Sequence, residues 1–120
     1  MKTKGRSDPN KITLIRLLKG VAAANNAKIW SLLASELSRA KRRRVTVNLS
    51  HLNRISSPGD VLLIPGKVLG TGLLNHQLDI AAESFSEAAR EKITSVGGHC
   101  LTIEDLVKKN PNGSKIRIIK

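Results

Sequence analysis

A dense run of basic residues is the strongest chemical feature of this sequence. Five of the seven residues from Ser38 to Arg44 carry positive charge, four of them as Arg. A guanidinium group is a planar fork that matches the oxygens of a phosphate, and each such cation displaces counterions from a polyanion. Because like charges at this density repel one another, we expect an exposed loop until an anion neutralises it. The run predicts phosphate binding; a solvated loop or a localisation signal is the plainer alternative.

A glycine-rich segment, Gly66–Gly72, invites comparison with nucleotide-binding loops but has the wrong spacing. In a phosphate-binding P-loop four residues separate the first Gly from Gly-Lys-Ser/Thr, whereas here Lys67 follows the first Gly directly. No obvious helix follows the glycines, as a dinucleotide fingerprint requires. We therefore expect Gly70-Thr71-Gly72 to form a tight corner that permits a close backbone approach. Lys67 and this corner are predicted to be a second, weaker contact with RNA backbone.

The remaining reactive side chains do not form a recognisable catalytic or metal-binding set. His51, His76 and His99 are scattered, and the adjacent His99 and Cys100 point opposite ways on a strand. Structural or RNA-contacting roles are favoured over metal binding, with Cys100 as a small core residue. The carboxylates of residues 83, 87 and 91 repeat at i+4, which is typical of a solvated helix face. We predict no enzyme activity, no metal site, no cofactor and no small-molecule substrate.

The composition points to an anionic partner. The chain has 120 residues, the length of one domain, with 21 Lys and Arg against 9 Asp and Glu, a net charge of +12. The first 60 residues hold 13 basic and 3 acidic residues, so anion binding is assigned mainly to that half. RNA, DNA and an anionic membrane surface all satisfy this charge. Because Trp30 and Phe85 are the only aromatic residues, base stacking is disfavoured and recognition of backbone and shape is favoured.

Cysteine usage and hydropathy predict an intracellular, cytoplasmic protein. Cys100 is the only cysteine, which excludes an intramolecular disulfide and a multi-thiolate zinc site. The charged N-terminus is not followed by the apolar run of a secretory signal. Apolar stretches such as Val61–Pro65 fall far short of the roughly 20 residues that a membrane-spanning helix needs.

The first half of the chain is predicted to be mainly helical. A basic arm occupies residues 1–10, and Asp8-Pro9 is typical of a helix start. Apolar residues at helical spacing predict a helix to about Ala24 and a second from Ala27 to Ser38, which together form a hairpin. After the basic run, the alternating Val45–Leu49 predicts a half-buried strand, and Ser50 is assigned as the cap of a short helix through Ile55.

The second half changes to short strands and helices. Strands are expected at Val61–Ile64 and Lys67–Leu69, separated by a turn at Pro65-Gly66. The other expected elements, in chain order, are a strand around Leu78 and Ile80, a helix capped by Ser84 with Glu87 and reaching Val96, a strand at His99–Ile103, a helix started by Thr102 with Asp105 and reaching Lys109, and a last strand around Ile116 and Ile118. This order favours an α/β or α+β fold with a helical N-terminal third.

Two motifs in this order resemble a known ribosomal protein family. The segment from Ser38 to Ser50, a basic run followed by Val-Thr-Val-Asn-Leu, resembles the hallmark of the archaeal and eukaryotic large-subunit protein L-eighteen-e. The stretch Lys67–Leu74, followed by Phe85-Ser86, Ala89, Ile93 and Gly97, is similar to the signature that this family shares with bacterial L-fifteen. The resemblance covers nearly the whole chain, and the brief arm looks like the archaeal form. Ala40 departs from the Pro expected in many members, which should loosen the entry to the loop.

The resemblance implies a fold, a partner and a role. It implies an α/β fold, an irregular superhelix of β-β-α units with two N-terminal helices packed on it, in one domain over residues 11–120. It implies a structural constituent of the large subunit that binds rRNA beside neighbouring ribosomal proteins. Combined with the charge pattern, it assigns RNA contacts to Lys2, Lys4, Arg6, Lys11, Arg39, Lys41, Arg42, Arg43, Arg44, Arg54, Lys67, Gly70, Thr71 and Gly72.

Three other classes remain open from the residues alone. They are a DNA-binding chromatin or regulatory protein, a small enzyme of RNA processing and a basic peripheral membrane protein. The second helix lacks an obvious row of Asn, Gln and Arg for reading bases, and no poised acid or nucleophile is evident. The sequence does not identify the rRNA helices or the neighbouring proteins that are contacted.

Overall fold

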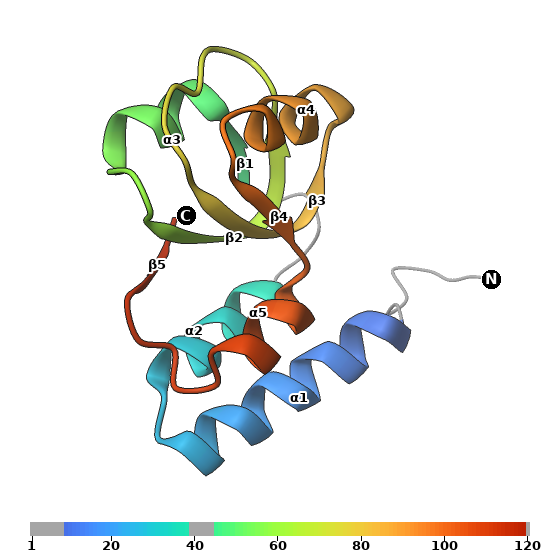
Figure 1. The fold of residues 1–120 in the computed structure, drawn as a ribbon. Helices are drawn as coiled ribbons and strands as arrows, with labels where there is room; N and C mark the ends of the chain where they lie inside the picture. Colours follow the sequence, from blue (N-terminus) through green and yellow to red (C-terminus); the bar gives the residue numbers. More distant parts are fainter. Residues whose placement is uncertain (1–8, 39–44, 120) are drawn as a thin grey trace, which may run out of the picture.

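A parallel sheet lies at the centre of the structure, with helices on both of its faces (Figure 1). The computed structural model describes residues 9–38 and 45–119. The elements, in chain order, are α1 (Pro9–Asn25), α2 (Lys28–Leu37), β1 (Val45–Asn48), α3 (Leu49–Ile55), β2 (Val61–Leu69), β3 (Asp79–Phe85), α4 (Glu87–Ser95), β4 (His99–Leu101), α5 (Ile103–Lys109) and β5 (Ile116–Ile118). The expected α/β class is confirmed. None of the described helices combines the length and apolar character needed to cross a bilayer.

The long strand β2 organises the sheet. Among the described residues the order is β1-β2-β3-β4, with β5 also paired to β2, and every pairing is parallel. The first part of β2, Val61–Leu63, pairs with β5, whereas Gly66–Leu69 pairs with β1. Since β3 runs along the opposite edge of β2, β1 and β5 share one edge, end to end. The first and last described strands, β1 and β5, are therefore both paired with β2.

The predicted turn at Pro65-Gly66 is wrong, because β2 continues through both residues. Pro65 and Gly66 are buried, and Gly66 is the register partner of Val45 in β1. The pairing with β3 shifts register between Ile64 and Lys67, so the irregularity is absorbed within the strand. A proline has no N–H to donate to a ladder, and a bulge is one of the places where a sheet tolerates it. Pairing of Gly66 with β1, and of Ile64 and Lys67 with β3, has overridden the local preference for a turn.

Alternation along the strands divides the interior into two cores. Leu62, Ile64 and Ile80 pack with α3 and α4 on one face, whereas Leu63 and Ala81 pack with α1, α2 and α5 on the other. Side chains two apart in a strand share a face, so a strand that is apolar at successive positions serves both cores. This explains why Val61–Ile64 of β2 and Ile80–Ala82 of β3 are apolar at every position.

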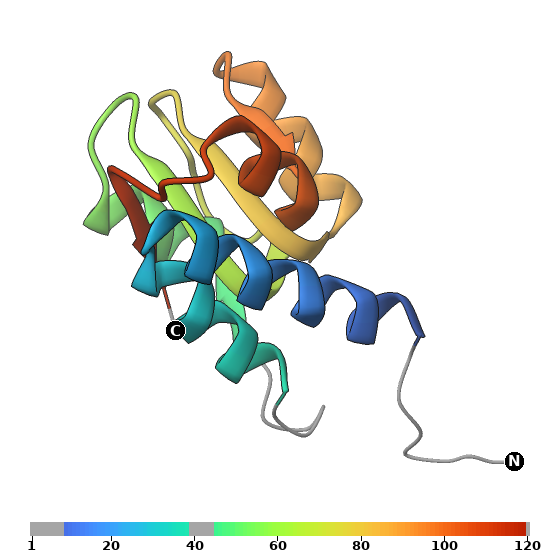
Figure 2. The ribbon, with the colours of Figure 1, turned by 90° about the horizontal axis from the view of Figure 1, so that it is seen from below.

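The predicted helical hairpin is confirmed as α1 and α2, which lie side by side (Figure 2). Asn26, with a φ of 52°, forms the turn between them, and Leu18 and Leu33 are fully buried. Trp30 of α2 donates an indole N–H to the carbonyl of Pro111 at 2.7 Å. This bond joins α2 to the turn before β5, so the N-terminal hairpin and the C-terminal segment stabilise each other.

Two helix starts differ from the sequence expectation. Ser84 pairs with Lys67 and Phe85 with Val68, so both belong to β3, and α4 begins two residues later. Its cap is Ser86, whose Oγ accepts a hydrogen bond from the Ala89 N–H at 3.1 Å. The predicted cap at Ser84 is therefore wrong, because sheet pairing extends the strand past it.

The short helix α3 is also capped differently. The predicted strand included Leu49, but β1 ends at Asn48 and α3 begins at Leu49. Asn48 therefore occupies the N-cap position. The Ser50 N–H donates to the Thr71 carbonyl at 3.1 Å, so Ser50 does not cap the helix but holds a loop. The expected start of α5 is confirmed, since Thr102 Oγ1 accepts from the Asp105 N–H at 3.0 Å.

Candidate nucleic-acid interface

The described structure defines where the predicted basic segments attach. Most of the predicted contact residues lie outside the described residues: Lys2, Lys4, Arg6, Arg39, Lys41, Arg42, Arg43 and Arg44. Because α1 and α2 form an antiparallel hairpin, the start of α1 and the end of α2 lie toward the same end of it (Figure 2). The chain before Pro9 and the chain after Ser38 are thus attached at that end. Lys11 lies in the first turn of α1, at the same end.

Lys67 lies close to where the basic run rejoins the sheet. Val45, the first described residue after the run, pairs with Gly66, the neighbour of Lys67. Lys67 itself has two register partners, Thr46 in β1 and Ser84 in β3, and all three side chains are exposed. Register partners in a parallel sheet point to the same face, so these three form a polar row across three strands. A cation flanked by two hydroxyl groups is suited to contact phosphate.

The glycine corner is a rigid structural element. At Gly70 a Cβ atom would lie 2.6 Å from the Ala88 Cβ, and at Gly72 it would lie 2.3 Å from the Ser50 Cβ. Gly72 also has a φ of +93°, which residues with a side chain rarely adopt. The corner therefore needs glycine to pass between the starts of α3 and α4, which confirms the predicted close approach of backbone.

Lys92, in the last turn of α4, holds the corner together. Its Nζ donates to the Gly70 carbonyl at 2.7 Å and to the Gly72 carbonyl at 2.8 Å. The third carbonyl, that of Thr71, accepts from the Ser50 N–H. All three corner carbonyls thus bind donors within the protein, while Thr71 and Gly72 remain exposed. No local pattern identifies Lys92, because its partners lie 20 and 22 residues away.

Beyond the corner, the loop is held along α3. Besides the Ser50 contact, Asn53 Oδ1 accepts from the Asn75 N–H at 3.2 Å, and Ser56 Oγ lies 2.9 Å from His76 Nε2. Ser50, Asn53 and the C-cap residue Ser56 are spaced by three, so they lie on one side of the helix. These contacts make the corner and α3 one unit.

Arg54 lies apart from the other described contact candidates. It is exposed in the last turn of α3, on the sheet face opposite Lys67 and toward the start of β2. The described candidate contacts therefore fall into three groups. They are Lys11 and Lys67 on the hairpin side of the sheet, the glycine corner beside α3, and Arg54. The distance between these residues along the sequence does not predict this grouping, because the grouping depends on which face of the sheet each residue occupies.

We expect Lys92→Met to destabilise the fold by about 1–2 kcal/mol while leaving the salt dependence of RNA binding unchanged. Removing the ammonium leaves the carbonyls of Gly70 and Gly72 without their donor, but it removes no phosphate contact. Urea unfolding and RNA titrations at several salt concentrations measure the two effects. The matched control is Lys108→Met, an exposed Lys on α5 that should change neither quantity much. A flatter salt dependence for Lys92→Met would instead make it an RNA ligand.

Two of the three histidines, His76 and His99, and the cysteine have structural partners in the described residues. His76 contacts Ser56, and His99 Nδ1 lies 2.8 Å from Asp79 Oδ1. Within residues 9–38 and 45–119, no three His, Cys, Asp or Glu side chains are grouped to hold a metal ion. Cys100 is half-buried against the core formed with α3 and α4, as expected for a small core residue.

Burial raises the pKa of the Cys100 thiol, and the nearby positive charge of Arg90 opposes this. Since only the thiolate reacts, we expect the pH profile for alkylation of Cys100 to lie above that of a free cysteine. Arg90→Gln should move the midpoint further upward, because the opposing charge is lost. Iodoacetamide kinetics as a function of pH measure this midpoint, with Arg54→Gln as control. A downward or absent shift in Arg90→Gln would contradict the assigned electrostatic coupling.

Comparisons with known proteins identify the family of the chain. Residues 23–101 match the family model described as ribosomal proteins 50S-L15, 50S-L18e and 60S-L27A. The chain belongs to this ribosomal protein family. It is 48% identical over 119 residues to the large ribosomal subunit protein eL18 of Methanococcus maripaludis, covering 99% of both chains. The eL18 proteins of Methanoregula boonei and Archaeoglobus fulgidus are 44% and 40% identical, covering 98% and 97% of those chains.

The match to the family model spans both motifs that the sequence singled out. It runs from the last turn of α1 to the end of β4, so it includes the basic run and the glycine corner. The family resemblance inferred from these motifs is thus confirmed. The N-terminal arm and β5 lie outside the matched residues.

Proposed function

We propose that this protein is a structural constituent of the large ribosomal subunit, which binds folded rRNA through its basic arm and Arg-rich run. The relatives that cover nearly its whole length are named as large-subunit proteins. A net charge of +12 fits a polyanionic partner. The scarcity of aromatic residues favours contacts to backbone and folded shape over stacking on bases.

The observation that carries this proposal is the common attachment of the basic segments. The arm and the run both join the helical hairpin at the same end, and the run rejoins the sheet beside Lys67. The described residues at which the two segments join the hairpin, Pro9 and Ser38, therefore lie toward one end of it, which supports a common surface for their contacts. Phosphate contacts of this kind position a protein on RNA, while specificity comes from the shape of the folded RNA.

The glycine corner supplies a second, weaker contact in this proposal. Its carbonyls are already bound by Lys92 and Ser50, so the corner does not need to rearrange to meet RNA. A preorganised loop loses little conformational entropy on binding. Thr71 and Gly72 are exposed and offer a smooth surface for close approach of the RNA backbone.

Sedimentation of a native lysate through sucrose gradients tests the proposal. The protein should travel with the large subunit in stoichiometric amount, both at moderate and at high salt. Retention at the top of the gradient would reject the ribosomal assignment, and release with genomic DNA would favour a chromatin role. Direct competition between duplex DNA and large-subunit rRNA for the purified protein checks the same choice of polyanion.

A further inference from the structure

Strand β1 and the second half of β2 share an exposed face on the hairpin side of the sheet. Leu63, in the first half of β2, is buried beneath α1, α2 and α5 (Figure 1), whereas Lys67 on the same face of that strand is exposed. Thr46 and Asn48 of β1 are exposed on this face too, since the buried Val47 between them belongs to the opposite core. The described helices therefore leave the carboxyl ends of these two strands open.

Three polar side chains are grouped on this face, and we call Thr46, Asn48 and Lys67 the sheet platform. Thr46 is the register partner of Lys67, and neighbouring strands lie about 4.8 Å apart. Asn48 lies two residues further along β1, about 7 Å from Thr46. Among the described residues, none of the three side chains forms a hydrogen bond or an ion pair, and Asn48 does not use its amide to cap α3. Their polar groups are therefore available to a partner.

The chemistry of the sheet platform fits a ribose–phosphate backbone. The Lys67 ammonium is a point charge that pairs with phosphate, whereas the Thr46 hydroxyl and the Asn48 amide can each donate and accept a hydrogen bond. A ribose 2′-hydroxyl also donates and accepts, so it can bond with either group. The platform has no aromatic side chain for stacking on a base and no large apolar side chain to anchor a protein partner.

The position of the platform also favours RNA. Neither β1 nor the part of β2 that pairs with it, Gly66–Leu69, contains an acidic residue, and the acidic Glu83 of β3 is half-buried. The Arg-rich run joins β1 at Val45, directly before Thr46. An RNA backbone that the run binds therefore lies near the platform, without an acidic strand between them.

We propose that the sheet platform binds the ribose–phosphate backbone of rRNA, with Thr46 and Asn48 on a ribose 2′-hydroxyl and Lys67 on the adjoining phosphate. These contacts give the protein a preference for RNA over DNA that charge alone does not provide, because DNA lacks the 2′-hydroxyl. The inference rests on the proposed function, since the ligand is rRNA, and it adds the chemical group that is recognised.

Nucleotide-analogue interference detects the contacted 2′-hydroxyl. In vitro transcripts of large-subunit rRNA carry 2′-deoxynucleotide phosphorothioates at random positions, and iodine cleavage of the protein-bound fraction shows where a missing hydroxyl weakens binding. We expect the wild-type protein to show interference that Thr46→Val and Asn48→Leu abolish, because in these variants the protein side of the contact is already absent. Transcripts with ribonucleotide phosphorothioates are the reference.

Two failures of this experiment have different meanings. Identical interference maps for the wild type and both variants would overturn the sheet platform and leave the proposed function intact. A wild-type protein that does not bind the transcript in preference to duplex DNA would overturn the proposed function as well.

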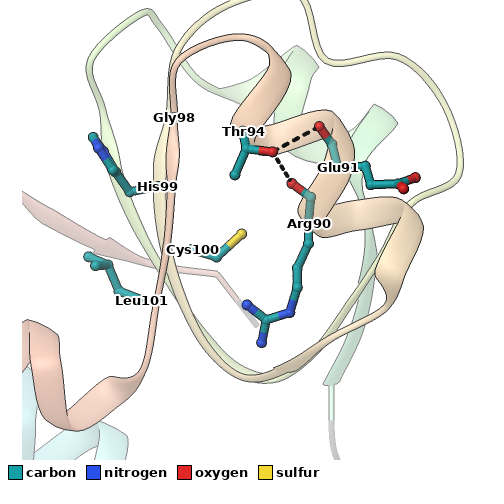
Figure 3. A pocket seen from close by; sticks show the side chains of 7 residues that line it. All are labelled: Arg90, Glu91, Thr94, Gly98, His99, Cys100 and Leu101. Carbon is teal, nitrogen blue, oxygen red and sulfur yellow. Dashed lines mark hydrogen bonds between the residues drawn. The ribbon is translucent and has the colours of Figure 1, made fainter.

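Thr94→Val is the matched control, because it makes the same isosteric change on the opposite side of the sheet. Thr94 lines a recess between α4 and β4, and its Oγ1 donates within α4 to the carbonyls of Arg90 at 2.9 Å and Glu91 at 3.1 Å (Figure 3). We expect Thr46→Val to weaken binding of the unmodified transcript about fivefold, the loss of one net hydrogen bond. Thr94→Val should change neither the affinity nor the interference map. Equal effects of the two variants would overturn the contact with Thr46.

Lys67→Met tests the phosphate contact separately. It should flatten the slope of log K against log salt by about one unit, because one fewer counterion is released when the transcript binds. Lys108→Met removes an exposed cation from α5 and should leave the slope unchanged. An unchanged slope for Lys67→Met, or equal slopes for the two variants, would overturn the role of Lys67 in the platform.

Discussion

Replacing Arg42, Arg43 and Arg44 with Ala is expected to weaken binding of large-subunit rRNA on the order of 100-fold at fixed moderate salt. Each contact to phosphate contributes about 1 kcal/mol net, so the loss of three costs about 3 kcal/mol. The slope of log K against log salt should flatten by about 2–3 units, because about three fewer counterions are released. Filter-binding titrations of the purified protein over a range of KCl concentrations measure both quantities.

A control with the same loss of charge separates this contact from general electrostatic attraction. Lys28→Ala, Lys108→Ala and Lys109→Ala together also remove three exposed cations, but from the start of α2 and the end of α5. This variant should retain most of the affinity and most of the salt slope. If the two triple variants behave alike, net charge and not the Arg-rich run drives binding. An unchanged slope in the Arg variant would refute the role of the run outright.

Gly72→Ala is expected to lower the free energy of unfolding by about 3 kcal/mol, through backbone strain and overpacking. The residue has a φ of +93°, and the new Cβ would lie 2.3 Å from the Ser50 Cβ at the start of α3. Neither the helix backbone nor the corner moves freely, because Lys92 and Ser50 bind the corner carbonyls. Urea unfolding followed by far-ultraviolet circular dichroism measures the change.

Two further glycines separate the causes of this loss. Gly59 has a φ of +86° with no atom near a new Cβ, so Gly59→Ala should show the backbone strain alone, about 1–2 kcal/mol. Gly20 lies inside α1 with open space around it, so Gly20→Ala should stabilise the protein by about 0.5–1 kcal/mol. A Gly72→Ala variant no less stable than Gly59→Ala would show that the corner is not tightly packed against α3.

Local signals predicted the elements that depend on nearby residues. The apolar spacing of α1 and α2 and the cap of Thr102 on Asp105 involve residues within a few turns of one another, and these predictions are confirmed. The turn expected at Pro65 and the cap expected at Ser84 failed for one common reason. Ser84 and the residues on both sides of Pro65 pair with strands far along the chain, and this pairing outweighs the local preferences.

The features of the candidate interface also divide into those that local sequence predicts and those that depend on tertiary structure. The basic run and the glycine corner are recognisable as residue types, so the amino-acid sequence is enough to predict them. The role of Lys92 and the separation of Arg54 from Lys67 were not predictable, since they follow from which helix lies on which face of the sheet. The open edge at β4 also depends on strand order, which no short motif specifies.

By itself, the sequence determined a basic composition, a helical N-terminal third and a ribosomal family motif, because charge, periodicity and short motifs are properties of neighbouring residues. Only the tertiary structure decided that Val45, where β1 begins, pairs with Gly66 beside Lys67, and that Lys92 binds the carbonyls of the glycine corner. It also decided that β4 lies at an edge of the described sheet. Parallel pairing joins residues across long loops, and the packing of whole helices selects among the possible pairings.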